Sequence, residues 1–358
     1  MPPDERRAGG LRADDERARG LLPVRGLRAG LLLPLRFAVV LLLVVAEPPA
    51  MRSTVTGETH ESHAPLAAHR ELSPQSAVQV KIPVCHALLM VALHHEEQGT
   101  PRPRPPAIWR TMSALDTGLV HLVGRLRVTG AIPRELKGRP LLLAANHIGV
   151  FDAFVLIAAC NRLGFAPRFL LAGGLLDAPV IGPALRASGH LRIDRGKATA
   201  LEQFDQAVEA MHTTTSPIIV YPEGRISHDP GLWPERGKTG AARLALAAGV
   251  PVIPVSQWGA HEAVYWGTEK VAGPADLLPL ARSGFTAPLR RPRFKVHFGT
   301  PVDLSDVDAG RPGAGMRAHT KIMRAIAGGL VPLRAGELDR PRFHDPTRPT
   351  DTVSPWRP

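Results

Sequence analysis

From residue 107 onward, hydrophobic positions recur with the period of a helix. Apolar residues stand three or four positions apart, which is the spacing of one helix face: Ile108, Met112, Leu115, Leu119, Leu122 and Leu126. Trp109, Val120 and Val123 widen this stripe, and arginines flank it. Two interpretations remain open at this stage. The helix packs on its own domain, or it lies on an anionic membrane surface.

Beyond this helix, short apolar runs alternate with helical stretches. Continuous apolar runs are typical of strands that are buried on both faces of a parallel sheet, and they occupy residues 140–145, 168–172, 217–221 and 251–256. A further run, 293–299, alternates with period two. Helices are expected near 152–162, 201–211, 240–249 and 315–330. The sequence therefore predicts an α/β fold with a mainly parallel central sheet flanked by helices, preceded by an amphipathic N-terminal helix.

Residues 1–106 differ from the rest of the chain in composition and in hydrophobic pattern. Pro34 and Arg36 interrupt the apolar run 31–46, which leaves a core shorter than the roughly 20 residues of a membrane-spanning helix. This region is interpreted as a disordered extension, as a weak anchor, or as sequence upstream of the true start. We expect one patterned domain at 107–335 and a loose Pro- and Arg-rich tail at 336–358.

Net charge narrows the class of partner. The chain carries a formal charge of +12, which favours nucleic acid, anionic lipid headgroups or phosphorylated substrates. Aromatic residues make up only 5% and no nucleic-acid recognition motif is present, so nucleic acid is not expected as a partner. Two cysteines, Cys85 and Cys160, cannot form a disulfide framework, and Cys160 is expected to be a small buried hydrophobe.

The first block with candidate chemistry is "NHIGVFD", residues 146–152. His147 follows a predicted buried strand, at the end where α/β folds place their ligand sites. A hydrogen bond from Asp152 would fix the tautomer of the imidazole and make its other nitrogen a better base. The alternative is that Asp152 only caps the next helix. A metal site is disfavoured because no third ligand stands at a suitable spacing.

Two further blocks also end predicted strands. In "GHLRIDR", residues 189–195, a short strand leads to Arg195 and Lys197, and two cations at a helix start are suited to hold a phosphate. A solvated loop with a surface Asp–Arg pair is the alternative. In "YPEGRIS", residues 221–227, Gly224 permits a tight turn, and Glu223 could accept a hydrogen bond from a substrate hydroxyl or hold a neighbouring arginine.

The fourth block, "VPVIPV", covers residues 250–255. Its two prolines remove ladder N–H groups, which indicates an edge strand or a place where something other than a strand packs alongside.

Together the four blocks resemble the glycerolipid acyltransferases, and in particular the 1-acylglycerol-3-phosphate acyltransferases. That family carries N-H-x4-D, then G-x-x-F-I-D-R, then F-P-E-G-T-R-S, then a block similar to V-P-V-I-P-V. The resemblance covers roughly residues 107–305 and keeps the order of all four motifs.

The resemblance implies that His147 is the general base and Asp152 its orienting partner. A free hydroxyl of a glycerol-phosphate lipid, with 1-acylglycerol-3-phosphate as the expected acceptor, would attack the thioester of acyl-CoA or of an acyl carrier protein to give phosphatidic acid. It implies no metal and no cofactor beyond the acyl donor. The implied substrate-binding residues are Asn146, Arg195, Lys197, Glu223, Gly224, Arg225 and, on the donor side, Pro254. It also implies an anionic membrane surface as partner, with the protein peripheral or weakly anchored at the cytoplasmic face of the cell membrane.

The sequence departs from the family pattern at two places. Arg192 stands where the family has Phe, and Arg225-Ile226 stands where it has Thr-Arg. Either Arg225 reaches the same phosphate from the neighbouring position, or the acceptor is another lysophospholipid.

Two other functions remain open. The same fold could serve as a non-catalytic lipid- or phosphate-binding module. Histidines at 60–63 and 94–97 suggest a metal-dependent hydrolase, but the second cluster lacks the second His of H-E-x-x-H.

Overall fold

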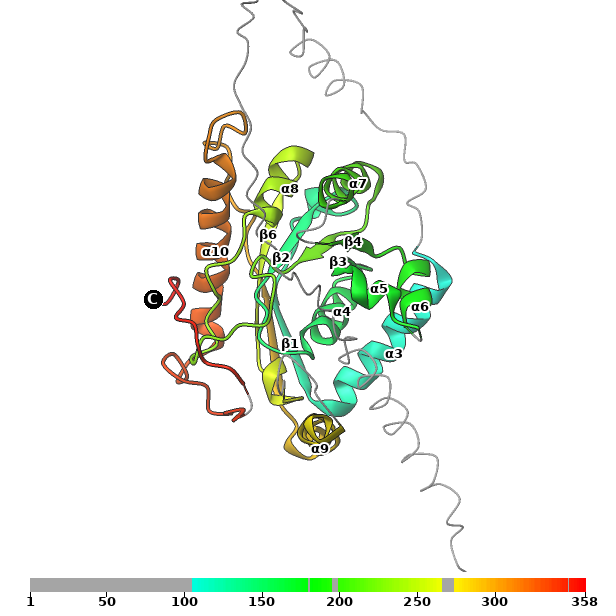
Figure 1. Cartoon of the computed structure of the whole chain (residues 1–358), viewed down its shortest axis with the longest axis vertical. Coiled ribbons are helices and arrows are strands. Elements are labelled where there is room, and N and C mark those ends of the chain that lie inside the picture. Colours follow the sequence, from blue (N-terminus) through cyan, green and yellow to red (C-terminus); the bar gives the residue numbers. More distant parts are fainter. Residues whose placement is uncertain (1–104, 180, 195–198, 266–273, 347) are drawn as a thin grey trace, which may run out of the picture.

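The computed structural model describes residues 105–179, 181–194, 199–265, 274–346 and 348–358 (Figure 1). Seven strands form one sheet in the order β1-β7-β6-β2-β5-β3-β4. The strands are β1 (Arg125–Gly130), β2 (Leu142–Ala145), β3 (Arg168–Ala172), β4 (Leu191–Ile193), β5 (Ile218–Val220), β6 (Val252–Trp258) and β7 (Arg293–Phe298). Only the β6–β7 pair is antiparallel within this sheet, so the prediction of a mainly parallel sheet is confirmed.

Helices cover both faces of the sheet (Figure 1). They are α3 (Ala107–Val123), α4 (Asp152–Arg162), α5 (Gly173–Asp177), α6 (Gly182–Ala187), α7 (Ala200–Thr213), α8 (Gly240–Ala248), α9 (Pro274–Arg290) and α10 (Ala314–Leu333), with short 3-10 turns η1 (Arg134–Leu136) and η2 (Ala260–Glu262). Alternate strand residues face opposite sides. Leu143 therefore packs with α3 and α4, whereas Leu142 packs with α7, α8 and α10.

Strand β6 is central, so the interpretation of the proline-bracketed block as an edge strand is wrong. Strand β2 lies on one side of β6 and β7 on the other. Pro254 O accepts a hydrogen bond from Gly299 N at 2.9 Å, just beyond the last β6–β7 pair, Val255 with Phe298. In a strand, the N and the C=O of one residue point to the same side. The missing N–H of Pro254 therefore faces the non-strand segment after β7, and no ladder bond is lost.

Strand β1 was not predicted from the sequence. Leu126 continues the spacing of the preceding helix, but α3 ends at Val123 and Leu126 belongs to β1. The break falls at Gly124, where a Cβ atom would lie 2.4 Å from Pro292 O. Only glycine allows this close approach, which brings β1 alongside β7.

Helix α3 buries a different row from the one that its main stripe indicated. The row that faces the protein is Trp109, Ser113, Asp116, Val120 and Val123. Ile108, Leu115 and Leu122 are 42%, 70% and 56% exposed. The helix thus packs on its own domain through one row and presents a parallel apolar row outward.

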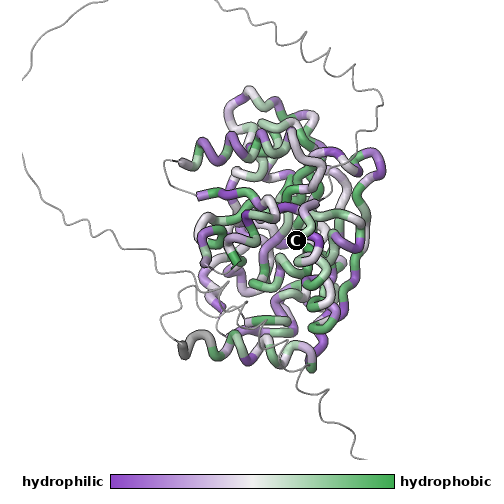
Figure 2. Tube along the Cα trace, turned by 90° about the vertical axis from the view of Figure 1, so that its right-hand side faces the viewer, coloured by the Kyte–Doolittle hydropathy of each residue, from purple (hydrophilic) through white to green (hydrophobic). Residues whose placement is uncertain are grey.

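Helix α9 carries a second exposed apolar row next to α3, which it contacts. In Figure 2, hydrophobic and hydrophilic turns alternate along α9, at the bottom of the view. Leu278, Phe285 and Leu289 are exposed, and their spacings of seven and four place them on one helix face. No helix in the described ranges combines the length and apolarity needed to cross a bilayer.

Asp116 provides a stability test of the buried row on α3. Its carboxyl is 7% exposed, both its oxygens lack a hydrogen-bond partner in the described residues, and burial raises its pKa to about 9. The folded state therefore keeps a proton that the unfolded chain loses above pH 4, so this group lowers stability as pH rises from about 4 to about 9. The unfolding free energy of Asp116→Asn minus that of the wild type should therefore rise by about 2 to 3 kcal/mol from pH 5 to pH 7. Urea denaturation of both proteins at both pH values measures this difference. The same difference at pH 5 and at pH 7 would contradict the prediction.

The C-terminal segment is not a loose tail. Residues 336–346 and 348–358 lie beside α10, at the red end of the chain in Figure 1. Ser354 and Arg348 are buried in it, at 5% and 9% exposure. Composition indicated disorder, but its polar side chains bind loop backbone that would otherwise be unpaired. We call residues 345–357, without residue 347, the C-terminal strap.

Candidate active site

His147 and Asp152 meet at the carboxyl end of β2. Asp152 is fully buried as the first residue of α4, and its Oδ2 lies 2.8 Å from His147 Nδ1. The same oxygen accepts the N–H groups of Ile148 at 2.5 Å and Gly149 at 3.0 Å. These two residues precede α4, and Asp152 makes no helix cap, so the interpretation of Asp152 as only a cap is wrong. An oxygen that accepts two N–H groups acts as an acceptor toward Nδ1 as well, which places the imidazole hydrogen on Nδ1.

The other ring nitrogen, Nε2, is left to act as a base. The His147 side chain is 21% exposed, and Nε2 has no hydrogen-bond partner among the residues that the structure describes. Tyr221 stacks on the imidazole, with ring centroids 4.0 Å apart and planes 12° apart. Burial raises the pKa of the Tyr221 phenol, so Tyr221 is neutral at ordinary pH. The geometry therefore combines an oriented imidazole, a buried carboxylate behind it and an aromatic face against it.

Asn146 fixes the backbone beside His147. It is fully buried, its Nδ2 donates to Gln257 O at 3.1 Å, and its Oδ1 accepts from Gln257 N at 2.8 Å. Gln257 returns a bond from Nε2 to Asn146 O at 2.8 Å. These bonds join the end of β2 to β6, so Asn146 supports the loop and its side chain is already occupied.

Glu223 supports the backbone of His147 from the opposite side. It is 3% exposed, Oε1 accepts His147 N–H at 2.7 Å, and Oε2 accepts Glu235 N–H at 2.8 Å. Burial raises the pKa of this carboxyl well above its usual range, and the two backbone donors act against that rise. Both oxygens are engaged by backbone, which does not fit the expectation that Glu223 binds a substrate hydroxyl. Gly224 makes the turn beside it with φ of 79°.

Arg225 and Ile226 take different positions. Arg225 Nε donates to Glu235 Oε2 at 3.0 Å, and its NH2 group donates to Thr352 Oγ1 of the C-terminal strap at 3.1 Å. Ile226 is 7% exposed. Arg225 is thus part of the contact between the loop after β5 and the strap, and its expected contact with a substrate phosphate stays a prediction.

Arg195 and Lys197 lie outside the described residues. The residues just before them form an ion-pair network in which Arg192 contacts both Asp194 at 2.6 Å and Asp177 at 2.8 Å. Arg192 lowers the pKa of Asp177 through this pairing. Asp194 also accepts Gly173 N–H at 3.1 Å. The departure at Arg192 therefore ties the end of β4 to α5.

Pro254 is buried within β6, where it pairs in register with Ala144 of β2. This places it in the sheet three residues below His147 along the neighbouring strand. A role for Pro254 on the donor side stays a prediction.

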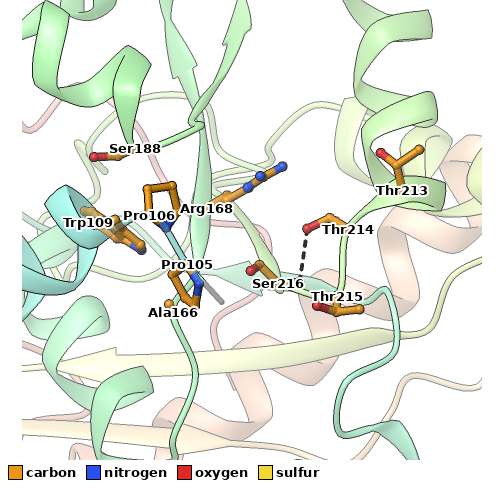
Figure 3. A pocket seen from close by; sticks show the side chains of 10 residues that line it. All are labelled: Pro105, Pro106, Trp109, Ala166, Arg168, Ser188, Thr213, Thr214, Thr215 and Ser216. Atoms are coloured by element: carbon orange, nitrogen blue, oxygen red, sulfur yellow. Dashed lines mark hydrogen bonds between the residues drawn. The ribbon is translucent and has the colours of Figure 1, made fainter. Parts of the chain in front are cut away.

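A cavity of about 180 Å³ lies at the other end of the sheet (Figure 3). Arg168, the first residue of β3, and Ser216, just before β5, line it together with Trp109. Because β2, β3 and β5 run parallel, this cavity opens at their amino ends, away from His147. It is separate from the candidate site.

Sequence reasoning missed three residues around the pair: Gln257 and Arg348, whose side chains bind the backbone of Asn146 and Ile148, and Glu235, whose backbone N–H binds Glu223. Gln257 and Glu235 follow two of the motifs closely in sequence, but nothing in their spacing signals these contacts. Arg348 lies 200 positions from Ile148, whose carbonyl it binds.

Comparison with known proteins finds a family model and named relatives that are similar to part of the chain. Residues 125–258 match the family model described as Acyltransferase. The chain is 29% identical over 160 residues to the 1-acyl-sn-glycerol-3-phosphate acyltransferase of Limnanthes alba, covering 42% of this chain and 54% of that protein. It is 36% identical over 158 residues to the enzyme of that name from Escherichia coli (strain K12), covering 43% and 61%. The chain thus spans 54% to 61% of the length of these relatives.

Among solved structures, the chain is similar to the crystal structure of the 1-acyl-sn-glycerophosphate (LPA) acyltransferase, PlsC, from Thermotoga maritima, with 18% sequence identity and a TM-score of 0.44. The match covers 62% of this chain and 80% of that one.

Proposed function

We propose that this chain, which carries an acyltransferase-family domain at residues 125–258, transfers a fatty acyl group to a free hydroxyl of a glycerol-phosphate lipid. The donor is acyl-CoA or an acyl carrier protein, and the acceptor is 1-acylglycerol-3-phosphate, which gives phosphatidic acid. One observation carries the proposal: Asp152 holds His147 through Nδ1 at 2.8 Å and leaves Nε2 available. The relatives that match this chain are named for the same reaction.

The reaction follows from this geometry. Nε2 of His147 removes the proton from the acceptor hydroxyl as its oxygen attacks the thioester carbonyl. The tetrahedral intermediate then collapses, the C–S bond breaks, and the departing thiolate takes the proton back from the imidazolium. Asp152 stabilises the imidazolium between these two steps. A thioester is already activated, so an oriented base and well-placed substrates supply what the reaction needs.

Basic residues of the second and third sequence blocks support a phosphorylated acceptor. Arg195 and Lys197 stand between β4 and α7 in sequence, and cations that precede a helix favour phosphate. Arg225 is the third candidate, although its guanidinium contacts Glu235 and Thr352. Ile226 is buried where the family pattern has Arg, so the identity of the acceptor headgroup is tested directly.

An acceptor panel with labelled acyl-CoA provides that test. The full-length protein is incubated with glycerol 3-phosphate, 1-acylglycerol-3-phosphate and lysophospholipids with larger headgroups. We expect the highest kcat/KM for 1-acylglycerol-3-phosphate. A preference for another lysophospholipid would change the assigned acceptor but keep the acyl-transfer reaction. No transfer to any acceptor by folded protein would reject the acceptor and the reaction.

We also propose that the exposed rows on α3 and α9 lie against the cytoplasmic face of the cell membrane. Leu115 and Leu122 project outward from α3, and the net charge of +12 favours anionic lipid. Replacing both by serine should lower binding to vesicles that contain phosphatidylglycerol by roughly tenfold, given the apolar area removed. Vesicle co-sedimentation measures this. Leu201→Ser, at an equally exposed leucine on α7, is the matched control, and equal losses in the two proteins would contradict the proposed surface.

A further inference from the structure

The C-terminal strap contacts the loop after β5 over most of its length. Its bonds to that loop are Asp351 to His228 Nδ1 at 2.8 Å, Thr352 Oγ1 from Arg225 at 3.1 Å, Ser354 N to Asp229 at 2.8 Å, Trp356 Nε1 to Glu235 O at 2.9 Å, and Arg357 to Asp229 at 2.8 Å. Asp229 and His228, which make these bonds, are nearly fully buried. The strap is therefore a packed part of the domain, and it covers the loop that contains Glu223.

Within the strap, Arg348 reaches both loops of the candidate site. Its side chain donates to Ser227 O at 3.0 Å and to Ile148 O at 2.5 Å, and it is only 9% exposed. Ile148 follows His147 directly, and Ser227 ends the block that contains Glu223. A planar guanidinium holds two acceptors in fixed directions, which an amine on a flexible stem does not.

The two bridged loops also bind each other at His147. His147 N–H donates to Glu223 Oε1 at 2.7 Å, and Ser227 N–H donates to His147 O at 2.8 Å. Arg348 adds a connection between Ile148, the residue after His147, and Ser227, which already belongs to this set. The position of the imidazole relative to the loop after β5 therefore depends on three connections, one of which comes from the strap.

Arg348 also places a positive charge close to the carboxylates of the site. The groups that face it are Asp345 on the strap, Asp152 on α4, Glu223 in the loop after β5 and His261 on η2. Burial lowers the pKa of Arg348, while the three carboxylates raise it, so the guanidinium stays charged. Burial, with Arg348 and Arg334 nearby, lowers the pKa of His261 and keeps that imidazole neutral. Arg348 is thus the buried cation that faces Asp152 and Glu223.

We propose that Arg348 is a positioning residue of the acyl-transfer site, which the C-terminal strap supplies to hold the His147 and Glu223 loops in register and to balance their buried carboxylates. The inference rests on the proposed function for its kinetic test. It adds a residue from outside the four sequence blocks and assigns the strap a role in the reaction.

Two substitutions in the full-length protein separate geometry from charge. Arg348→Lys keeps the charge but loses the two-directional hydrogen bonding, so kcat should fall about 10- to 100-fold with a smaller change in KM. Arg348→Gln removes the charge as well and leaves Asp152 and Glu223 without the cation that faces them, so kcat should fall further than in Arg348→Lys. Arg324→Gln, at an exposed arginine of α10, is the matched control and should change neither quantity.

Hydrogen exchange gives a second measurement that needs no activity. Backbone amides at 147–149 and 223–227 should exchange faster in both Arg348 variants than in wild type, whereas those of β2 should not. Acyl transfer by the wild type is measured first. If the wild type transfers no acyl group but both variants exchange faster, the proposed function is rejected and the positioning role of Arg348 is kept. Active wild type with unchanged kcat in a folded Arg348→Gln variant would overturn the inference.

Discussion

Replacing His147 by alanine is expected to lower kcat for acyl transfer by at least about 10²- to 10⁴-fold, the usual contribution of a positioned base. The reason is that no other imidazole replaces Nε2 at the end of β2 within the described residues. His261, which is close in the fold, is buried at 2% exposure and packs on Trp258. Initial rates with labelled acyl-CoA and 1-acylglycerol-3-phosphate measure the effect.

The fold should survive this change. His147 contributes its backbone N–H to Glu223 and its carbonyl to Ser227, and alanine keeps both groups. Circular dichroism and thermal unfolding of the variant should therefore be close to wild type. His212→Ala, at an exposed histidine of α7, is the matched control and should retain full activity. Turnover near the wild-type rate in His147→Ala would contradict the proposed mechanism.

The second large effect is expected for Asp152→Asn. The amide oxygen can still accept the N–H groups of Ile148 and Gly149, but it brings no charge to the imidazolium that forms in the reaction. We expect kcat to fall by about 10²-fold or more, with a smaller change in KM, because the interaction strengthens mainly in the transition state.

Kinetic constants and thermal unfolding of Asp152→Asn distinguish this role from simple loss of structure. The variant should unfold close to the wild-type temperature and keep KM within a small factor while kcat falls, because the lost charge acts on the imidazolium of the transition state. A KM that rises as much as kcat falls, or a lost unfolding transition, would show that Asp152 does not act on the base through its charge.

The central elements of the fold were predictable because their patterns are local. The strand 168–172 and the helix α4 were predicted with their observed limits, since an apolar run and a helical spacing can both be read from neighbouring positions. The pair of His147 and Asp152 was also predictable, because only a short turn separates them.

The remaining features depend on contacts between distant residues. Strand β1 continues the apolar spacing of α3, and only the approach of Gly124 to Pro292 O reveals the break. The exposed row of α3 and its buried row differ by one position, so periodicity alone could not decide which faces the protein. The central strand β6 can contain Pro254 because the missing N–H of that proline faces a non-strand segment. The strap has the composition of a disordered tail, and its order comes from bonds to loops more than 100 positions away.

The most direct test of the central claim follows the label itself. Full-length protein is mixed with labelled acyl-CoA, with and without 1-acylglycerol-3-phosphate, and label is counted in lipid, in residual donor and on the protein. The account predicts that label moves to phosphatidic acid with one equivalent of free thiol, only when the acceptor is present, and that none stays on the protein. Label bound covalently to the folded protein, or thiol release at the same rate without acceptor, would contradict direct transfer to a hydroxyl activated by His147.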